Sequence, residues 1–124
     1  MSKFELITQQ FEMALQRLEE VLQQEKNAFM RDSAIQRFEF TFDLSWKAIK
    51  AYLQEIHGIE CFSPKGCFRE AYQQGLIVYD PRWLEMVDDR NRTAHLYKEA
   101  MAERVYAQLP DYLQLFKKLL QGLK

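Results

Sequence analysis

The chain has 124 residues, and its 17 Lys and Arg against 18 Asp and Glu give a formal net charge of −1. This balance excludes a broadly basic nucleic-acid coat and an acidic solvating tail, but it leaves room for a small basic site. Hydrophobic residues make up 48% of the chain and aromatic residues 14%, with only four Gly and three Pro. We therefore expect a globular protein and not a turn-rich β-sandwich.

Two long amphipathic helices are predicted at the start of the chain. Apolar residues recur at three- and four-residue steps over residues 4–22, which places one apolar stripe on a helix of roughly six turns. A second stripe covers residues 35–56, and Asp32 or Ser33 is the expected N-cap of its helix. We expect a short loop over residues 27–31 and an antiparallel pairing of the two helices.

Two Pro-containing pairs mark the starts of the next helices. Ser63 followed by Pro64 is an N-cap with proline at the first helical position, and Asp80 followed by Pro81 repeats the pattern. The first pair predicts a short helix that ends near residue 74. The second pair predicts a helix through the charged segment that follows it.

The remaining segments complete an all-helical prediction. We interpret residues 76–79, which are all apolar or aromatic, as a connector tucked under the bundle. A last helix is expected from about residue 98, and Pro110 should kink it or split it in two. No repeat, low-complexity stretch or linker interrupts the chain. Residues 1–124 are therefore predicted to form one domain, an all-α antiparallel four-helix up-and-down bundle with an additional short helix.

The cysteines and the motifs that are absent bear on compartment and chemistry. Cys61 and Cys67 are too few for a disulfide framework or a structural zinc site, so we expect two partly buried thiols in a reducing cytosol. The first residues lack the apolar run of a signal peptide, and no stretch approaches the roughly 20 apolar residues of a membrane span. The sequence has no nucleotide-binding loop and no His-Glu-x-x-His motif. We expect a soluble, cytoplasmic protein with neither a metal nor another cofactor.

The chain has two His, and their surroundings differ. His57 precedes Gly58, which suits a left-handed helix C-cap, so a structural role at a helix end is expected. His95 lies in the segment DDRNRTAHLYK, which runs from Asp88 to Lys98. Arg presents a planar fork for phosphate, and His can transfer a proton near neutral pH. Together these groups can orient a phosphate of RNA and activate the neighbouring ribose 2′-hydroxyl.

Helical geometry limits how these groups can meet. Arg90 and His95 are five residues apart, which separates them by roughly 140° around an unbroken helix. Their convergence requires either a helix end near Thr93 or a second copy of the chain that supplies the missing group. In the alternative interpretation, Arg90 and Arg92 form ion pairs with the acidic side chains of residues 85–89, and His95 marks an ordinary helix end.

One face of the second predicted helix carries both signs of charge. Glu39, Asp43, Lys47 and Lys50 follow one another at three- and four-residue steps, which indicates a solvated face with internal ion pairs. Phe40 lies off the apolar stripe of the same helix, where either the core or a subunit contact can hold it.

The charged segment resembles a known family. Arg90, four intervening residues, His95, one residue and Tyr97 match the Arg-x4-His-x-Tyr motif of HEPN-domain proteins. The segment RFEFTFDLSWK, residues 37–47, resembles the second-helix signature of the nucleotidyltransferase substrate-binding protein family, a branch of the HEPN proteins. The resemblance extends over most of the chain.

The resemblance implies a helical homodimer that is encoded beside a minimal nucleotidyltransferase and associates with it. In the toxin–antitoxin version of such pairs, the HEPN protein is a metal-independent ribonuclease toxin. Its Arg and His meet across the dimer in a composite site. The partner acts as the antitoxin by transferring AMP from ATP to the tyrosine of the motif.

The same resemblance assigns roles residue by residue. Arg90 would bind and polarise the phosphate, His95 would act as general acid and base, and Tyr97 would accept AMP. The expected substrate-binding residues are the polar and basic side chains around them: Asn91, Arg92 and Lys98. A second interpretation makes the chain the non-catalytic substrate-binding subunit of a two-component nucleotidyltransferase. A third is a helical interaction module without chemistry.

Overall fold

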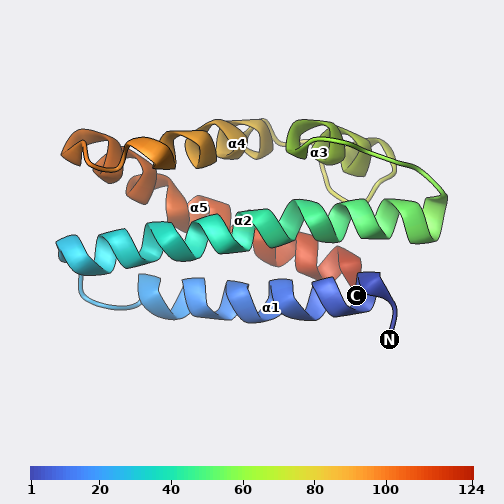
Figure 1. Cartoon of the computed structure of the whole chain (residues 1–124), viewed down its shortest axis with the longest axis horizontal. Helices are drawn as coiled ribbons and strands as arrows, with labels where there is room; N and C mark the ends of the chain where they lie inside the picture. Colours follow the sequence, from blue (N-terminus) through green and yellow to red (C-terminus); the bar gives the residue numbers. More distant parts are fainter.

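The computed structural model describes all residues, 1–124, and contains only helices and their connections. The elements are α1 (Lys3–Leu22), α2 (Ala28–His57), α3 (Pro64–Gln73), α4 (Arg82–Arg92), the 3₁₀ helix η1 (Thr93–His95) and α5 (Glu99–Leu123). α1 and α2 lie antiparallel, α3 and α4 follow one another along the other side of α2, and α5 returns behind it (Figure 1). This arrangement confirms the four-helix up-and-down bundle with one additional short helix. None of the helices has the length and apolar character needed to cross a membrane.

Aromatic side chains from every helix form much of the core. The rings of Phe11 and Phe38 lie 5.9 and 6.3 Å from the ring of Phe116, which joins α1, α2 and α5. The rings of Phe68 and Trp83 lie 4.8 Å apart and join α3 to α4. Such pairs add to the large apolar area that aromatic rings remove from water. The high aromatic content of the chain is therefore mostly a property of its core.

The start of α2 differs from the prediction. The side chain of Asn27 accepts a hydrogen bond from the backbone N–H three residues later, at 2.8 Å, and so caps the helix. As a result α2 begins at Ala28, and the predicted start at Asp32 or Ser33 is wrong, as is the predicted loop over residues 27–31. Both residues are good caps in isolation, but an earlier residue already fills that role.

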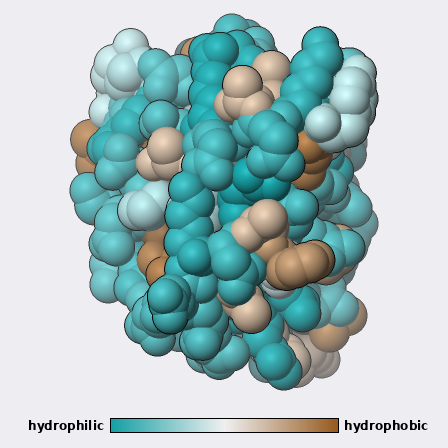
Figure 2. Space-filling view, turned by 90° about the vertical axis from the view of Figure 1, so that its left-hand side faces the viewer, coloured by the Kyte–Doolittle hydropathy of each residue, from teal (hydrophilic) through white to brown (hydrophobic).

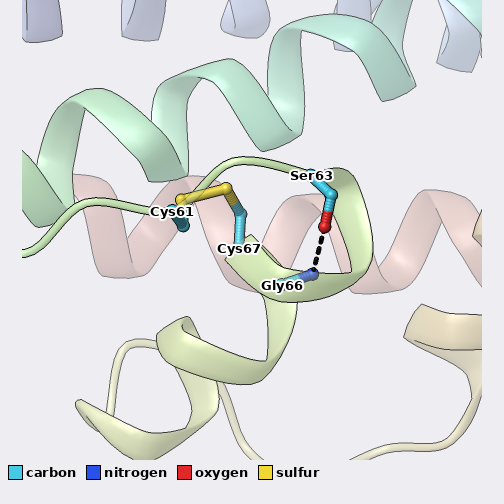
Figure 3. Close-up of a disulfide and its surroundings, with 4 residues drawn as sticks. All are labelled: Cys61, Ser63, Gly66 and Cys67. Atoms are coloured by element: carbon cyan, nitrogen blue, oxygen red, sulfur yellow. Dashed lines mark hydrogen bonds between the residues drawn. A yellow bond between two sulfur atoms is a disulfide. The ribbon is translucent and has the colours of Figure 1, made fainter.

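The entry to α3 contains a disulfide. Ser63 accepts a hydrogen bond from the backbone N–H of Gly66 (3.1 Å), and Pro64 is the first helical residue, as predicted. Cys61 and Cys67 are buried and bonded to each other, so the expectation of two free thiols is wrong (Figure 3). The turn at Ser63 brings their Cα atoms to 5.2 Å, within the range that a disulfide spans. In the chain-entropy model, closing so short a loop contributes about 2 kcal/mol to stability.

The connector from α3 to α4 is less buried than expected. Ile77 is buried, whereas Val78 is 86% exposed and Tyr79 67% exposed. The interpretation of residues 76–79 as a segment tucked under the bundle is therefore correct for Ile77 and wrong for the two residues after it. The connector passes over the surface of the bundle, so only one of its sides faces the core.

α4 and α5 begin and continue largely as the sequence predicts. The carboxylate of Asp80 accepts a hydrogen bond from the backbone N–H of Arg82 (2.9 Å), which satisfies a donor in the first turn of α4. The guanidinium of the same arginine lowers the pKa of Asp80. Pro110 lies inside α5, which is not split and continues to Leu123. Burial of Leu109 and Tyr112, close to Pro110 on either side, offsets the backbone hydrogen bond that proline cannot make.

Candidate functional site

The charged segment, which runs from Asp88 to Lys98, begins inside α4 and continues past the end of this helix. α4 ends at Arg92 and is followed by the single turn of η1, so the helix end near Thr93, one of the two alternatives for bringing Arg90 and His95 together, is present. The hydroxyl of Thr93 donates a hydrogen bond to the carbonyl oxygen of Arg90 (2.6 Å) and accepts one from Nη1 of the same arginine (3.1 Å). This end of the bundle, where α2 also begins, presents a mostly hydrophilic surface with scattered apolar groups (Figure 2).

Arg90 extends from α4 to α2. Its Nε and Nη2 donate to the carboxylate of Asp43 at 3.4 and 3.3 Å, and its Nη1 lies 3.5 Å from Oε2 of Glu39. The bonds to Asp43 are longer than usual for N–H···O and therefore weak. A guanidinium has five N–H donors, and Asp43 and Thr93 take up three of them. Arg90 is thus held in a defined orientation, is 30% exposed and keeps donors for an anion.

Arg92 lies on the other side of α4, because two residues turn a helix by roughly 200°. Its Nη1 donates to the carboxylate of Asp89 at 2.6 Å. Asp89 is buried and also accepts a hydrogen bond from the hydroxyl of Tyr112 on α5. Burial, with help from the nearby carboxylate, raises the pKa of Tyr112, so this phenol stays protonated and remains a donor. The structure does not bring Arg92 together with Arg90.

His95, Tyr97 and Lys98 form an exposed group after α4. The hydroxyl of Tyr97 lies 3.5 Å from Nδ1 of His95, and the ammonium of Lys98 lies 5.9 Å from the centre of the tyrosine ring. Tyr97 is 76% exposed. Asn91 is also exposed, and its side chain makes no hydrogen bond within the chain. These contacts are loose enough for each side chain to reorient toward a ligand.

Arg90 and His95 make no hydrogen bond to each other within one chain. Arg90 is directed to α2, whereas His95 contacts Tyr97. The alternative interpretation, in which the arginines pair with residues 85–89, is correct for Arg92 and wrong for Arg90. A second copy of the chain as the source of the missing group stays a prediction.

Comparison with known proteins places the chain in a family. Residues 6–124 match the family described as nucleotidyltransferase substrate binding protein like. The chain belongs to this family.

A relative from Haemophilus influenzae, named probable ribonuclease HepT, is 39% identical over 95 residues. The match covers 73% of this chain and 65% of the relative, which is slightly less than two thirds of its length. A crystal structure from Thermus thermophilus is 44% identical, with a TM-score of 0.87 over 92% of this chain and 98% of the other. A structure from Haemophilus influenzae, described as the fold of a substrate binding domain of a nucleotidyltransferase, is 31% identical, with a TM-score of 0.83 over 94% of this chain and 98% of the other.

In this member of the nucleotidyltransferase substrate-binding family, sequence reasoning missed the carboxylates that hold Arg90. Glu39 and Asp43 were expected to form ion pairs with lysines of their own helix, and those pairs are absent. Their i, i+4 spacing on one helix face was the available signal. The partner residue lies on α4, and the sequence does not show that its side chain reaches this face of α2.

Sequence reasoning also missed a buried arginine near the site. Arg31 is 4% exposed and donates to the carboxylates of Glu99 (2.6 Å) and Glu103 (3.1 Å) on α5. These hydrogen bonds lower the pKa values of both glutamates; Lys26 contributes most to the shift of Glu103. The contacts fix the first turns of α5, which follow directly after the exposed group. The prediction placed the start of α2 after this residue, so its role could not be recognised.

Proposed function

We propose that the chain is the ribonuclease toxin of a toxin–antitoxin pair and cleaves RNA without a metal ion. The observation that carries this proposal is the arrangement at the end of α4, where a held but partly exposed Arg90 precedes an exposed His95 and Tyr97. The relative named probable ribonuclease HepT supports the same activity.

The proposed chemistry requires only side chains and RNA. Arg90 binds the phosphate and stabilises the negative charge that develops on it. His95 removes the proton from the ribose 2′-hydroxyl, whose oxygen attacks phosphorus and displaces the 5′-oxygen. The leaving 5′-oxygen takes up a proton from solvent and His95 later releases its proton to solvent, so the products are a 2′,3′-cyclic phosphate and a 5′-hydroxyl. We propose that Asn91 and Lys98 contact the same strand; any contact from Arg92 has to come from the other side of α4.

We further propose that two copies of the chain form the site, with Arg90 from one copy and His95 from the other. This accounts for the lack of a hydrogen bond between these residues within one chain. Phe29 is 84% exposed and Phe40 47% exposed. They are eleven residues apart, so they lie on nearly the same face of α2, roughly 20° apart around its axis. Exposed aromatic side chains on one face are typical of subunit contacts.

Mixing two inactive variants tests the enzyme and the composite site together. Arg90→Ala and His95→Ala are each expected to be inactive on a labelled RNA in the presence of EDTA. After mixing and subunit exchange, a mixed dimer contains one intact site, so about a quarter of the wild-type activity should return. Inhibition of the wild type by EDTA would contradict the metal-free chemistry. If each variant alone were as active as the wild type, the proposed roles of Arg90 and His95 in RNA cleavage would be contradicted.

We propose that the antitoxin is a minimal nucleotidyltransferase that modifies Tyr97. The phenolic oxygen attacks the α-phosphorus of ATP, pyrophosphate leaves, and the phenolic proton is released to solvent. The 76% exposure of this side chain gives a partner access to its hydroxyl. A phosphodiester beside His95 adds negative charge where RNA phosphate has to bind, so it blocks the site by repulsion and by occlusion.

Replacing Tyr97 by phenylalanine is expected to abolish this modification. Co-expression of the wild-type chain with its nucleotidyltransferase partner should add the mass of one or more AMP groups, detected by intact-protein mass spectrometry. Tyr79→Phe removes the hydroxyl of another exposed tyrosine and should leave the added mass unchanged. The same added mass on Tyr97→Phe would place the modification elsewhere.

Replacing Asp43 by alanine is expected to lower RNA cleavage by about 10- to 100-fold, because Arg90 loses the contacts that orient it. Asp43→Asn keeps an oxygen acceptor at the same position and should retain more of the activity. The pH dependence of cleavage should be unchanged in both variants, because Asp43 acts through Arg90 and transfers no proton. Asp111→Ala removes an exposed carboxylate on α5 and serves as the matched control. Equal activity of Asp43→Ala and this control would contradict the positioning role.

A second candidate function is a substrate-binding subunit that presents a molecule to the nucleotidyltransferase. The observation that favours it is the similarity to a structure described as a substrate binding domain of a nucleotidyltransferase. In that case the partner's nucleotidyl transfer should depend on this chain, and expression of the chain alone should not arrest growth. RNA should remain intact with wild type and with His95→Ala alike.

A further inference from the structure

A basic groove lies between α1 and α2, further along α2 than Glu39 and Asp43, which hold Arg90. It has a volume of about 220 Å³ and lies where the start of α1 meets the second half of α2. Its lining contains no acidic side chain and consists of Lys3, Ile7, Trp46, Lys47, Lys50, Ala51 and Gln54. The groove therefore combines three ammonium groups with an apolar floor.

The three lysines of the groove have no carboxylate partner. Other lysines of the chain, such as Lys26 and Lys65, form ion pairs at 2.6 and 3.1 Å. Of the nearby carboxylates on α2, Glu39 and Asp43 contact Arg90, and Glu55 accepts a hydrogen bond from Ser2; none of them lines the groove or pairs with its lysines. In a chain with a net charge of −1, this is a local concentration of uncompensated positive charge. Such a concentration attracts an anionic ligand.

Trp46 gives the groove an aromatic surface. The chain has two tryptophans, and Trp83 is 4% exposed within the core. Trp46 is only partly buried and lines the groove between lysines. An aromatic face beside cations is the combination with which proteins bind single-stranded nucleic acid, since bases stack on the ring and lysines pair with phosphates.

The groove continues from the candidate site along the same helix. Asp43, which holds Arg90, lies one turn before Lys47 and two turns before Lys50. At a rise of 1.5 Å per residue, Asp43 and Lys50 are separated by roughly 10 Å along the axis of α2. This distance corresponds to roughly three stacked nucleotides of a strand. A strand held at Arg90 can therefore reach the groove without a gap.

We propose that the groove formed by Lys3, Trp46, Lys47 and Lys50 binds single-stranded RNA. The lysines neutralise phosphates and one base stacks on Trp46. The inference rests on the proposed function in one respect: the strand in the groove is the one whose phosphate lies at Arg90. The aromatic surface favours RNA over an acidic protein segment, which supplies carboxylates but no base to stack.

The test measures binding separately from cleavage. A fluorescein-labelled single-stranded RNA is titrated with the His95→Ala protein, and the dissociation constant is determined by anisotropy at several salt concentrations. In this background, Lys47→Gln with Lys50→Gln is expected to weaken binding about tenfold. The slope of log affinity against log salt should fall by about 1.4, or 0.7 for each lost phosphate contact. Arg69→Gln with Lys118→Gln removes two exposed cations outside the groove and should change neither quantity.

The aromatic contact has its own measurement. Trp46→Leu should weaken binding roughly tenfold, whereas Trp46→Phe keeps a ring and should retain most of the affinity. RNA should quench the tryptophan fluorescence of the protein with Trp46 in place and not that of Trp46→Phe, because Trp83 is buried. Circular dichroism of each variant separates a loss of contact from a loss of fold.

Three outcomes would overturn the proposal. One is equal binding by the double-lysine variant and its control, and another is the absence of RNA binding altogether. The third is competition by poly-glutamate at the same charge concentration as RNA, which would show that the groove accepts acidic protein. Failure of the proposed function gives a different result. If RNA binding depended on the lysines but the wild type did not cleave RNA, the proposed nuclease activity would be refuted, and the proposal that the groove binds RNA would stand.

Discussion

Replacing His95 by alanine is expected to lower the rate of RNA cleavage by about 10²- to 10⁴-fold, the usual contribution of one general acid or base. The side chain is exposed, and its ring contacts Tyr97. Its removal therefore leaves no cavity and breaks no core contact, so the unfolding free energy should stay within about 0.5 kcal/mol of the wild type. A large loss of activity with an unchanged fold would identify a chemical role.

The chain offers a matched control for this variant. His57 is the other histidine and is exposed at the end of α2, where its ring contacts Tyr52. His57→Ala should cleave RNA at the wild-type rate in the same assay, with initial rates measured in EDTA. If both variants were equally slow, the loss would come from a general effect on the protein. If both were as fast as the wild type, His95 would have no part in the reaction.

The sequence predicts the fold well because helical signals are local. The apolar stripes at three- and four-residue steps determine which residues face the core, and the Ser63 and Asp80 turns determine where helices begin. The start of α2 was misplaced because several good caps follow one another, and local rules do not rank Asn27 above Asp32 or Ser33. The disulfide was missed because pairing depends on a turn that brings two cysteines together.

The candidate site is predictable only in part, because its contacts join distant segments. Arg90, His95 and Tyr97 lie around the end of α4, which helical spacing had offered as one of two ways to bring Arg90 and His95 together; their roles stay a prediction. The carboxylate partners of Arg90 lie 47 or more positions earlier in the chain, on α2. No spacing rule connects such positions; they meet because the tertiary fold places the end of α4 within reach of α2 for a side chain as long as Arg90. Arg90 and Arg92 point to opposite sides because two residues turn a helix by roughly 200°, although both looked like parts of one basic cluster.

Replacing Tyr112 by phenylalanine should destabilise the protein by about 1.5–3 kcal/mol, the usual contribution of a hydrogen bond to a charged group. The hydroxyl of Tyr112 donates to the buried carboxylate of Asp89, which otherwise pairs only with Arg92. Without the hydroxyl, a buried negative charge loses one of its two partners. Tyr106→Phe makes the same chemical change on α5 at a hydroxyl that makes no hydrogen bond within the chain. It should have little effect in urea unfolding, and an equal effect of both variants would contradict this account.

The stabilising effect of Tyr112 should also depend on pH, in a direction fixed by its titration. Burial raises the pKa of this phenol above its usual value of about 10. A group whose pKa is raised by folding contributes stability that is fully present below the pKa of the unfolded chain and is lost as pH rises toward the folded value. The gap in unfolding free energy between wild type and Tyr112→Phe should therefore be constant up to about pH 9 and shrink above about pH 10. A gap that stayed constant through this range would show that the hydroxyl is not buried against Asp89. Because Asp89 directly precedes Arg90, loss of this contact should also loosen the end of α4 and lower RNA cleavage, which Tyr106→Phe should leave unchanged.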